Sequence, residues 1–161
     1  MPVDDDYPTC CETYVTLRLY HPSDNPEKVT EFLGITPSKS QMVGEMWEQR
    51  NRKEKYQLSG WFFTSEGSLE SYDSEKHLDW LLSQIEPKLS ILQSLIAEHG
   101  WRADIACLWD SQSGHGGPTL SPALLRRLSV LGIELWFDVY FHGAYFKIRN
   151  RKTVDAIQQN S

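Results

Sequence analysis

Three segments of the chain alternate along the sequence with the two-residue period of a strand that has one buried face. They span residues 14–20, 101–109 and 133–141, and a fourth segment, 56–64, is rich in aromatic residues around Gly60. These patterns predict four strands. At Gly60 the missing side chain predicts a bulge or a close neighbour.

Two short helices are marked at both ends. The helix predicted at 25–34 begins with an Asn-Pro pair and ends at Gly34, and the helix predicted at 121–132 begins with Ser-Pro and ends at Gly132. These are the residues that favour an N-cap, a first-turn proline and a left-handed C-terminal cap. Both halves of the chain then continue with isoleucine, so the pattern predicts a duplicated strand–helix unit.

Between the halves, apolar residues spaced by four and three positions predict one long amphipathic helix, capped by Asp73 or Ser74 and ended by Gly100. Pro87 lies inside it. Because proline removes a backbone donor and crowds the preceding turn, we expect a kink at residues 84–87, or two abutting helices that share one buried face. The apolar stripe consists of Leu78, Leu82, Ile85, Leu89, Leu92 and Ile96.

Together these elements predict an α+β fold, a two-layer sandwich with helices on one face of a four- to five-stranded antiparallel or mixed sheet. Two βαβ halves joined by the long kinked helix would give a ferredoxin-like plan. A doubly wound parallel sheet is the alternative, but its strands would be near-continuous apolar runs. We expect residues 1–13 to be disordered or extended, residues 14–149 to form a single domain, and residues 150–161 to be a basic tail.

Two segments have no sustained period and are predicted to be irregular loops, where function most often resides. Residues 36–55 are charged and polar and read as a long surface loop. Residues 110–119 are glycine-rich and precede a helix whose first-turn amides could hold an anion. This loop lacks the lysine of a phosphate-binding loop, and Pro122 removes one donor, so a flexible connector is favoured.

A set of short motifs occurs in a fixed order along the chain: Ser23-Asp24-Asn25-Pro26, Val29-Thr30, Leu33-Gly34-Ile35, Pro37-Ser38, Gly44, Ser59-Gly60-Trp61, Leu131-Gly132 and Phe137-Asp138-Val139-Tyr140. In order and spacing, these motifs resemble a known family, the bacterial domain of unknown function numbered 4279, over roughly residues 14–142. The resemblance implies a small cytosolic bacterial protein and brings no established catalytic residues. It also implies a role for some members as immunity proteins encoded beside toxins.

Composition narrows the function classes. The chain has 161 residues, 40% of them hydrophobic, which suits one folded domain. Its net charge of −6 disfavours nucleic acid and acidic membranes and favours a basic protein partner. An odd cysteine count and the lack of a leader or membrane-spanning run predict a cytoplasmic protein without disulfides. The scattered histidines and adjacent cysteines predict no metal site, and no motif indicates a cofactor.

The first functional hypothesis is a non-enzymatic protein-binding module, such as an immunity protein whose acidic surface covers a basic toxin site. Its candidate binding residues are Glu66, Glu70 and Asp73, near loop ends. Trp80 is out of step with the apolar stripe and is a candidate aromatic anchor, although core packing is favoured for it.

The second hypothesis is a small enzyme or ligand-binding protein that uses loop 110–119, with His115, and one face of the last strand, with Asp138. The competing structural interpretation of Asp138 is a buried carboxylate paired with Arg18 or Arg102. Alternation places Asp138 on one face with Trp136, Tyr140 and His142.

Overall fold

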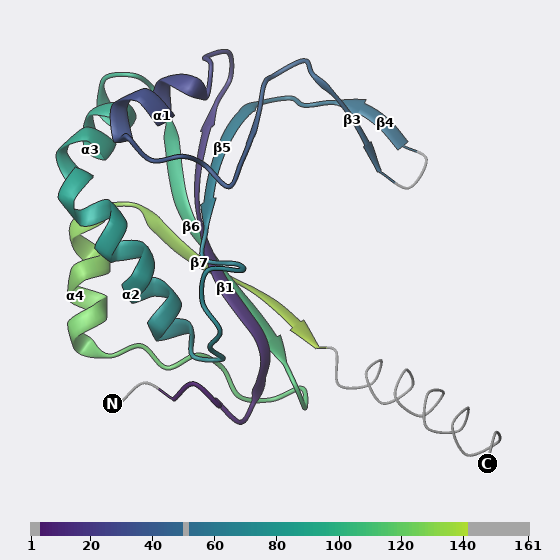
Figure 1. The fold of residues 1–161 in the computed structure, drawn as a ribbon, viewed down its shortest axis with the longest axis vertical. Coiled ribbons are helices and arrows are strands. Elements are labelled where there is room, and N and C mark those ends of the chain that lie inside the picture. Colours follow the sequence, from purple (N-terminus) through teal and green to yellow (C-terminus); the bar gives the residue numbers. More distant parts are fainter. Residues whose placement is uncertain (1–3, 50–51, 142–161) are drawn as a thin grey trace.

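The computed structural model describes residues 4–49 and 52–141, and these form an α+β fold built on a mixed five-stranded sheet of order β2-β5-β1-β6-β7 (Figure 1). A separate pair of strands, β3 and β4, makes a second, two-stranded sheet. The strands are β1 (Cys10–His21), β2 (Lys39–Gln41), β3 (Met46–Gln49), β4 (Arg52–Lys55), β5 (Ser59–Thr64), β6 (Arg102–Ser111) and β7 (Glu134–Phe141).

The two halves of the chain have different strand directions. β1 pairs antiparallel with β5 on one side and with β6 on the other, whereas β6 and β7 are parallel neighbours. Only the second half is therefore a βαβ unit, and the predicted ferredoxin-like duplication is not confirmed. The duplication was predicted from the similar caps of the two short helices. A cap marks where a helix ends, but it carries no information about the direction of the next strand.

The helices are α1 (Glu27–Leu33), α2 (Ser74–Ile85), α3 (Leu89–Ala97) and α4 (Pro122–Leu131), and in Figure 1 α2, α3 and α4 lie to the left of the sheet. Their end signals act as predicted. Gly34 and Gly132 adopt left-handed φ values of 65° and 68°, and the Asp73 and Ser121 side chains accept hydrogen bonds from first-turn amides. The expected break at Pro87 is confirmed, since a 3₁₀ turn, Glu86–Lys88, separates α2 from α3.

The core lies between the helices and the inner face of the sheet. Val15, Leu17 and Leu19 alternate along β1 with partly exposed residues, and each is fully buried. Trp61 of β5 is also fully buried, and its Nε1–H donates to Thr30 Oγ1 of α1 at 3.1 Å. The two-residue period in the sequence therefore reports the inner face of the sheet correctly.

The predicted loop 36–55 is instead largely strand. It contains β2 at the sheet edge and the hairpin of β3 and β4, which projects away from the rest of the protein in Figure 1. The described residues of the hairpin are mostly exposed and charged on both faces. It therefore lacks the apolar alternation by which a half-buried strand is recognised. The prediction for Gly60 is confirmed as a close neighbour, because a Cβ there would lie 2.5 Å from the Phe62 ring.

The first strand is longer than expected, since β1 begins at Cys10 rather than at residue 14. Within residues 4–49 and 52–141, no helix is long and apolar enough to cross a bilayer. The predicted basic tail, 150–161, and His142 lie outside the described residues.

Candidate functional site

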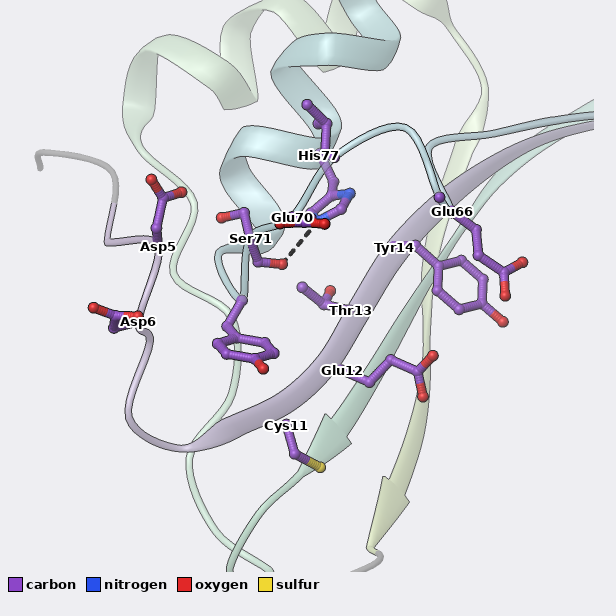
Figure 2. A pocket seen from close by; sticks show the side chains of 13 residues that line it. Asp5, Asp6, Cys11, Glu12, Thr13, Tyr14, Glu66, Glu70, Ser71 and His77 are labelled. Atoms are coloured by element: carbon purple, nitrogen blue, oxygen red, sulfur yellow. Dashed lines mark hydrogen bonds between the residues drawn. The ribbon is translucent and has the colours of Figure 1, made fainter.

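An open cleft of about 450 Å³ lies where β5 ends and β1 continues with β6 as its only neighbouring strand among the described residues (Figure 2). One wall is the beginning of β1, from Cys11 to Tyr14. The opposite wall is the turn at residues 66–72 that leads into α2, and the segment at residues 5–6 closes the end of the cleft. The cleft is therefore assembled from two parts of the chain that are distant in sequence, residues 5–14 and residues 66–77.

Carboxylates dominate the lining. Asp5, Asp6, Glu12, Glu66 and Glu70 all line the cleft, and each is exposed to solvent. The lining residues include no lysine or arginine. This concentration of like charge in one concave surface gives a strongly negative local potential that attracts cationic groups.

The nearest ion pair leaves this potential largely in place. Lys76 Nζ lies 2.7 Å from Asp5 Oδ1, and this hydrogen bond lowers the pKa of the Asp5 carboxyl. Lys76 thereby offsets one carboxylate at the end of the cleft. The other four acidic side chains have no ion pair among residues 4–49 and 52–141.

His77, near the start of α2, lines the floor of the cleft and is neutral. The residue is 1% exposed, and burial lowers the pKa of its ring below the usual 6.5. Nε2 lies 2.9 Å from the Ser71 carbonyl, which can only accept, so Nε2 carries the proton and Nδ1 accepts from Ser65 Oγ at 2.7 Å. Through these two hydrogen bonds, His77 of α2 holds Ser65 and Ser71, which lie at the start and near the end of the acidic turn at residues 66–72.

This arrangement predicts a loss of stability in mild acid. Because the pKa of His77 is lowered in the folded state, the unfolded chain binds a proton below about pH 6.5 that the folded chain does not. The contribution of His77 to the free energy of unfolding should therefore be complete above about pH 6.5. Below that pH, the free energy of unfolding should fall by at most about 1.4 kcal/mol per pH unit. Urea titrations from pH 7.5 to 5 measure this slope.

A matched variant isolates the contribution of His77. His77→Gln keeps an N–H donor for the Ser71 carbonyl but does not titrate. Its unfolding free energy should have a shallower dependence on pH than that of the wild-type protein. Equal slopes for the two proteins would show that His77 does not control the acid response.

Tyr14 stands between two of the carboxylates. Figure 2 shows the Glu66, Tyr14 and Glu12 side chains projecting in the same direction, on the side of the sheet that faces away from the helices. Burial raises the pKa of the Tyr14 hydroxyl, and the charges of Glu66 and Glu12 raise it further. The cleft thus joins an aromatic ring to a cluster of anionic groups.

Nucleophilic chemistry has little support in the cleft. Cys11 Sγ lies 3.4 Å from the Asp110 carbonyl oxygen. Burial and the charge of Asp110 raise the pKa of this thiol, so it stays protonated and weakly nucleophilic at neutral pH. Among the residues the structure describes, no group of three histidine, cysteine or acidic side chains could hold a metal ion. The chemistry that the cleft favours is the binding of a cation.

The predicted acidic residues have two different roles. Glu66 and Glu70 line the cleft. Asp73 does not line it, because it is 6% exposed and its carboxylate accepts hydrogen bonds from the Glu75 and Asp4 amides. Asp73 therefore caps α2 and anchors the segment before β1 instead of offering a binding surface.

Trp80 and His115 lie apart from the acidic turn. Trp80 is half-buried, and its ring stacks on Phe63 with 5.2 Å between centroids, as core packing requires. His115 is exposed in the predicted glycine-rich loop, with Nε2 at 3.2 Å from Ser113 Oγ. Neither residue lines this cleft, nor a second cleft of about 540 Å³ beside Trp101 and Asp104.

Asp138 lies on the side of the sheet away from the helices and accepts a hydrogen bond from the Tyr140 hydroxyl at 3.1 Å. The predicted pairing with Arg18 or Arg102 is wrong. Arg18 makes a bidentate bond to Asp104, at 2.7 and 3.0 Å, and no ion pair joins Asp138 to Arg102 within the described residues. The Arg18 guanidinium also lies 4.8 Å from the centroid of the Trp136 ring. Asp138 nevertheless lies close enough for its charge to raise the pKa of Tyr14.

Sequence reasoning missed several lining residues. Asp5 and Asp6 belong to an acidic run in the segment predicted to be disordered or extended, and Glu12 precedes the predicted start of the first strand. The acidic run was a visible signal. Its position opposite Glu66 and Glu70 was not, because it depends on the pairing of β1 with β5.

The comparisons with known proteins identify the family. The model described as domain of unknown function (DUF4279) matches residues 11–142. No curated protein and no solved structure matches the chain. The match covers more than half of the chain and confirms the resemblance seen in the capped helices and strands. The chain therefore belongs to the DUF4279 family.

Proposed function

We propose that this protein is a non-enzymatic binding module whose acidic cleft holds a basic segment of a partner protein. The observation that carries the proposal is the convergence of five carboxylates, Asp5, Asp6, Glu12, Glu66 and Glu70, on one cleft without a lining lysine or arginine. Complementary charge of this kind steers a basic partner and selects against acidic ones.

An immunity protein for a basic toxin is the role we favour within this class. Such a protein works by covering a cationic active surface, and a concave anionic surface suits that task. The net charge of −6 acts in the same direction at long range. The proposed role belongs in a bacterial cytoplasm, beside the toxin that it neutralises.

The alternative, a small enzyme or ligand-binding protein, would be supported by a pocket that contains His115, Asp138 or His142, and His142 lies outside the described residues. Neither His115 nor Asp138 lines either of the two clefts described above. His115 contacts Ser113 and Asp138 contacts Tyr140, both neighbours in their own segments. Support for this hypothesis is therefore weaker than for the binding module.

The test is the capture of basic proteins from the source organism by the purified chain, followed by affinity measurements on the captured partner. A triple variant, Glu12→Gln, Glu66→Gln and Glu70→Gln, should lower the affinity at least about tenfold, because each exposed interfacial charge contributes roughly 0.5–1 kcal/mol. The variant should also weaken the dependence of affinity on salt.

A matched control has the same change in net charge elsewhere. Glu31→Gln, Glu54→Gln and Glu98→Gln alter exposed carboxylates that do not line the cleft. This control should keep the affinity of the wild-type protein. If the cleft variant and the control bound the partner equally well, the acidic cleft would not be the binding site.

A further inference from the structure

β1 extends beyond the strand that pairs with its outer side. β5 pairs with β1 only from Thr16 to His21, whereas β6 pairs with β1 from Cys10 onward. The first part of β1 therefore has a strand on one side only. The acidic cleft occupies the other side, where β5 would continue if it were longer.

The backbone of Thr13 faces this side. In an antiparallel ladder, alternate residues direct their N–H and C=O groups to opposite neighbours. Val15 bonds toward the β5 side, since its carbonyl accepts from the Ser65 amide at 2.9 Å and its amide donates to Ser65 Oγ at 3.0 Å. Thr13, two residues earlier, must present its amide and carbonyl in the same direction.

The chain turns away before it can pair with Thr13. After Ser65 it forms a turn in which the Ser68 amide donates to the Ser65 carbonyl at 3.0 Å. The described residues place no strand beside Cys10–Tyr14 on this side. Thr13 lines the cleft and is 5% exposed, so its edge groups face the cleft from the bottom of the wall formed by β1.

Acidic residues around an open strand edge have two interpretations. Charged side chains commonly protect an edge against pairing with other chains. Here all the lining charges have one sign, so they repel a second copy of this acidic chain and at the same time attract an extended basic segment. A strand edge without a partner strand also offers main-chain hydrogen bonds, which give affinity to peptides that add as an extra strand.

We infer that an extended basic segment of the partner binds by adding a strand to the edge of β1 at Thr13. This inference rests on the proposed function and specifies its mode of binding. The segment would exchange main-chain hydrogen bonds with Thr13. Its alternate side chains would project beside Glu12 and Glu66 on the open side of the sheet.

The pleat of β1 also defines the sequence that fits. Glu12 and Tyr14 face the open side, so lysine or arginine suits the positions beside them. Thr13 faces the helices, and its Oγ1 lies 2.7 Å from Ser74 Oγ. The residue of the bound segment that lies beside Thr13 should therefore be small. The expected motif in the partner is a basic, a small and a second basic residue in succession.

The test uses a capped hexapeptide in which lysine alternates with threonine, together with two N-methylated isomers. One isomer is methylated at every lysine amide and the other at every threonine amide, so the two have the same charge and the same number of methyl groups. A peptide that adds as a strand uses the amides of one edge only. One isomer should therefore bind at least about tenfold more weakly than the other.

Amide hydrogen exchange gives a second, residue-specific measurement. In the free protein the Thr13 amide should exchange faster than the Tyr14 amide, since Tyr14 pairs with Leu108 in the β1–β6 ladder. The peptide should slow the exchange of Thr13 and leave that of Tyr14 unchanged. Equal affinities of the two isomers, or no protection of Thr13, would overturn strand addition.

The outcomes separate this inference from the proposed function. If both isomers bind equally and Glu12→Gln, Glu66→Gln and Glu70→Gln abolish binding, the acidic cleft binds basic segments by another mode. If the three substitutions leave the binding of the unmodified hexapeptide unchanged, the proposed function fails as well.

Discussion

Trp61→Ala should remove about 3–5 kcal/mol from the free energy of unfolding. Trp61 lies in β5, is fully buried, and donates an Nε1–H hydrogen bond to Thr30 of α1. The substitution removes both the ring and this hydrogen bond. Truncation leaves a cavity the size of an indole and leaves the Thr30 hydroxyl without its Trp61 donor. The loss is large because a domain of this size is stable by only about 5–15 kcal/mol. Urea denaturation followed by circular dichroism measures the change.

Trp136→Ala is the matched control for Trp61→Ala. Trp136 is 39% exposed and lies over the Arg18 guanidinium on the open side of the sheet. Its removal should cost about 1 kcal/mol or less, as for an exposed cation–π contact. Similar losses for the two variants would mean that the inner face of the sheet is not where the core lies.

The second large effect concerns binding. Glu12→Lys, Glu66→Lys and Glu70→Lys together should weaken the lysine–threonine hexapeptide at least about a hundredfold, because like charges at an interface cost several kcal/mol. All three side chains are exposed, so the free energy of unfolding should change by less than about 1 kcal/mol. Calorimetric titration and urea denaturation measure the two quantities separately. An affinity within tenfold of the wild-type value would contradict this expectation.

The sequence was most informative where a local signal has one structural meaning. Gly34, Gly132 and Ser121 act at the helix ends as predicted, and Pro87 breaks the long helix. Each of these effects depends only on a residue and its nearest neighbours in the chain. Alternation along β1 likewise identified the buried side of the sheet.

Long-range pairing was not predictable in the same way. The antiparallel pairing of β1 with β5 is not encoded in either strand alone, so the duplicated pattern of helices suggested a ferredoxin-like plan. For the same reason, the sequence predicted only some of the residues that line the candidate site. Glu66 and Glu70 were chosen for their charge, but only the register of β5 against β1 brings them opposite Glu12.

The most direct test of the central claim, that the acidic cleft binds a cationic segment through complementary charge, is a charge exchange. The affinities of a lysine–threonine and a glutamate–threonine hexapeptide would be measured for the wild-type protein and for the Glu12→Lys, Glu66→Lys, Glu70→Lys variant. We expect the wild-type protein to bind only the lysine peptide and the variant to prefer the glutamate peptide. The claim would be contradicted if the variant still preferred the lysine peptide.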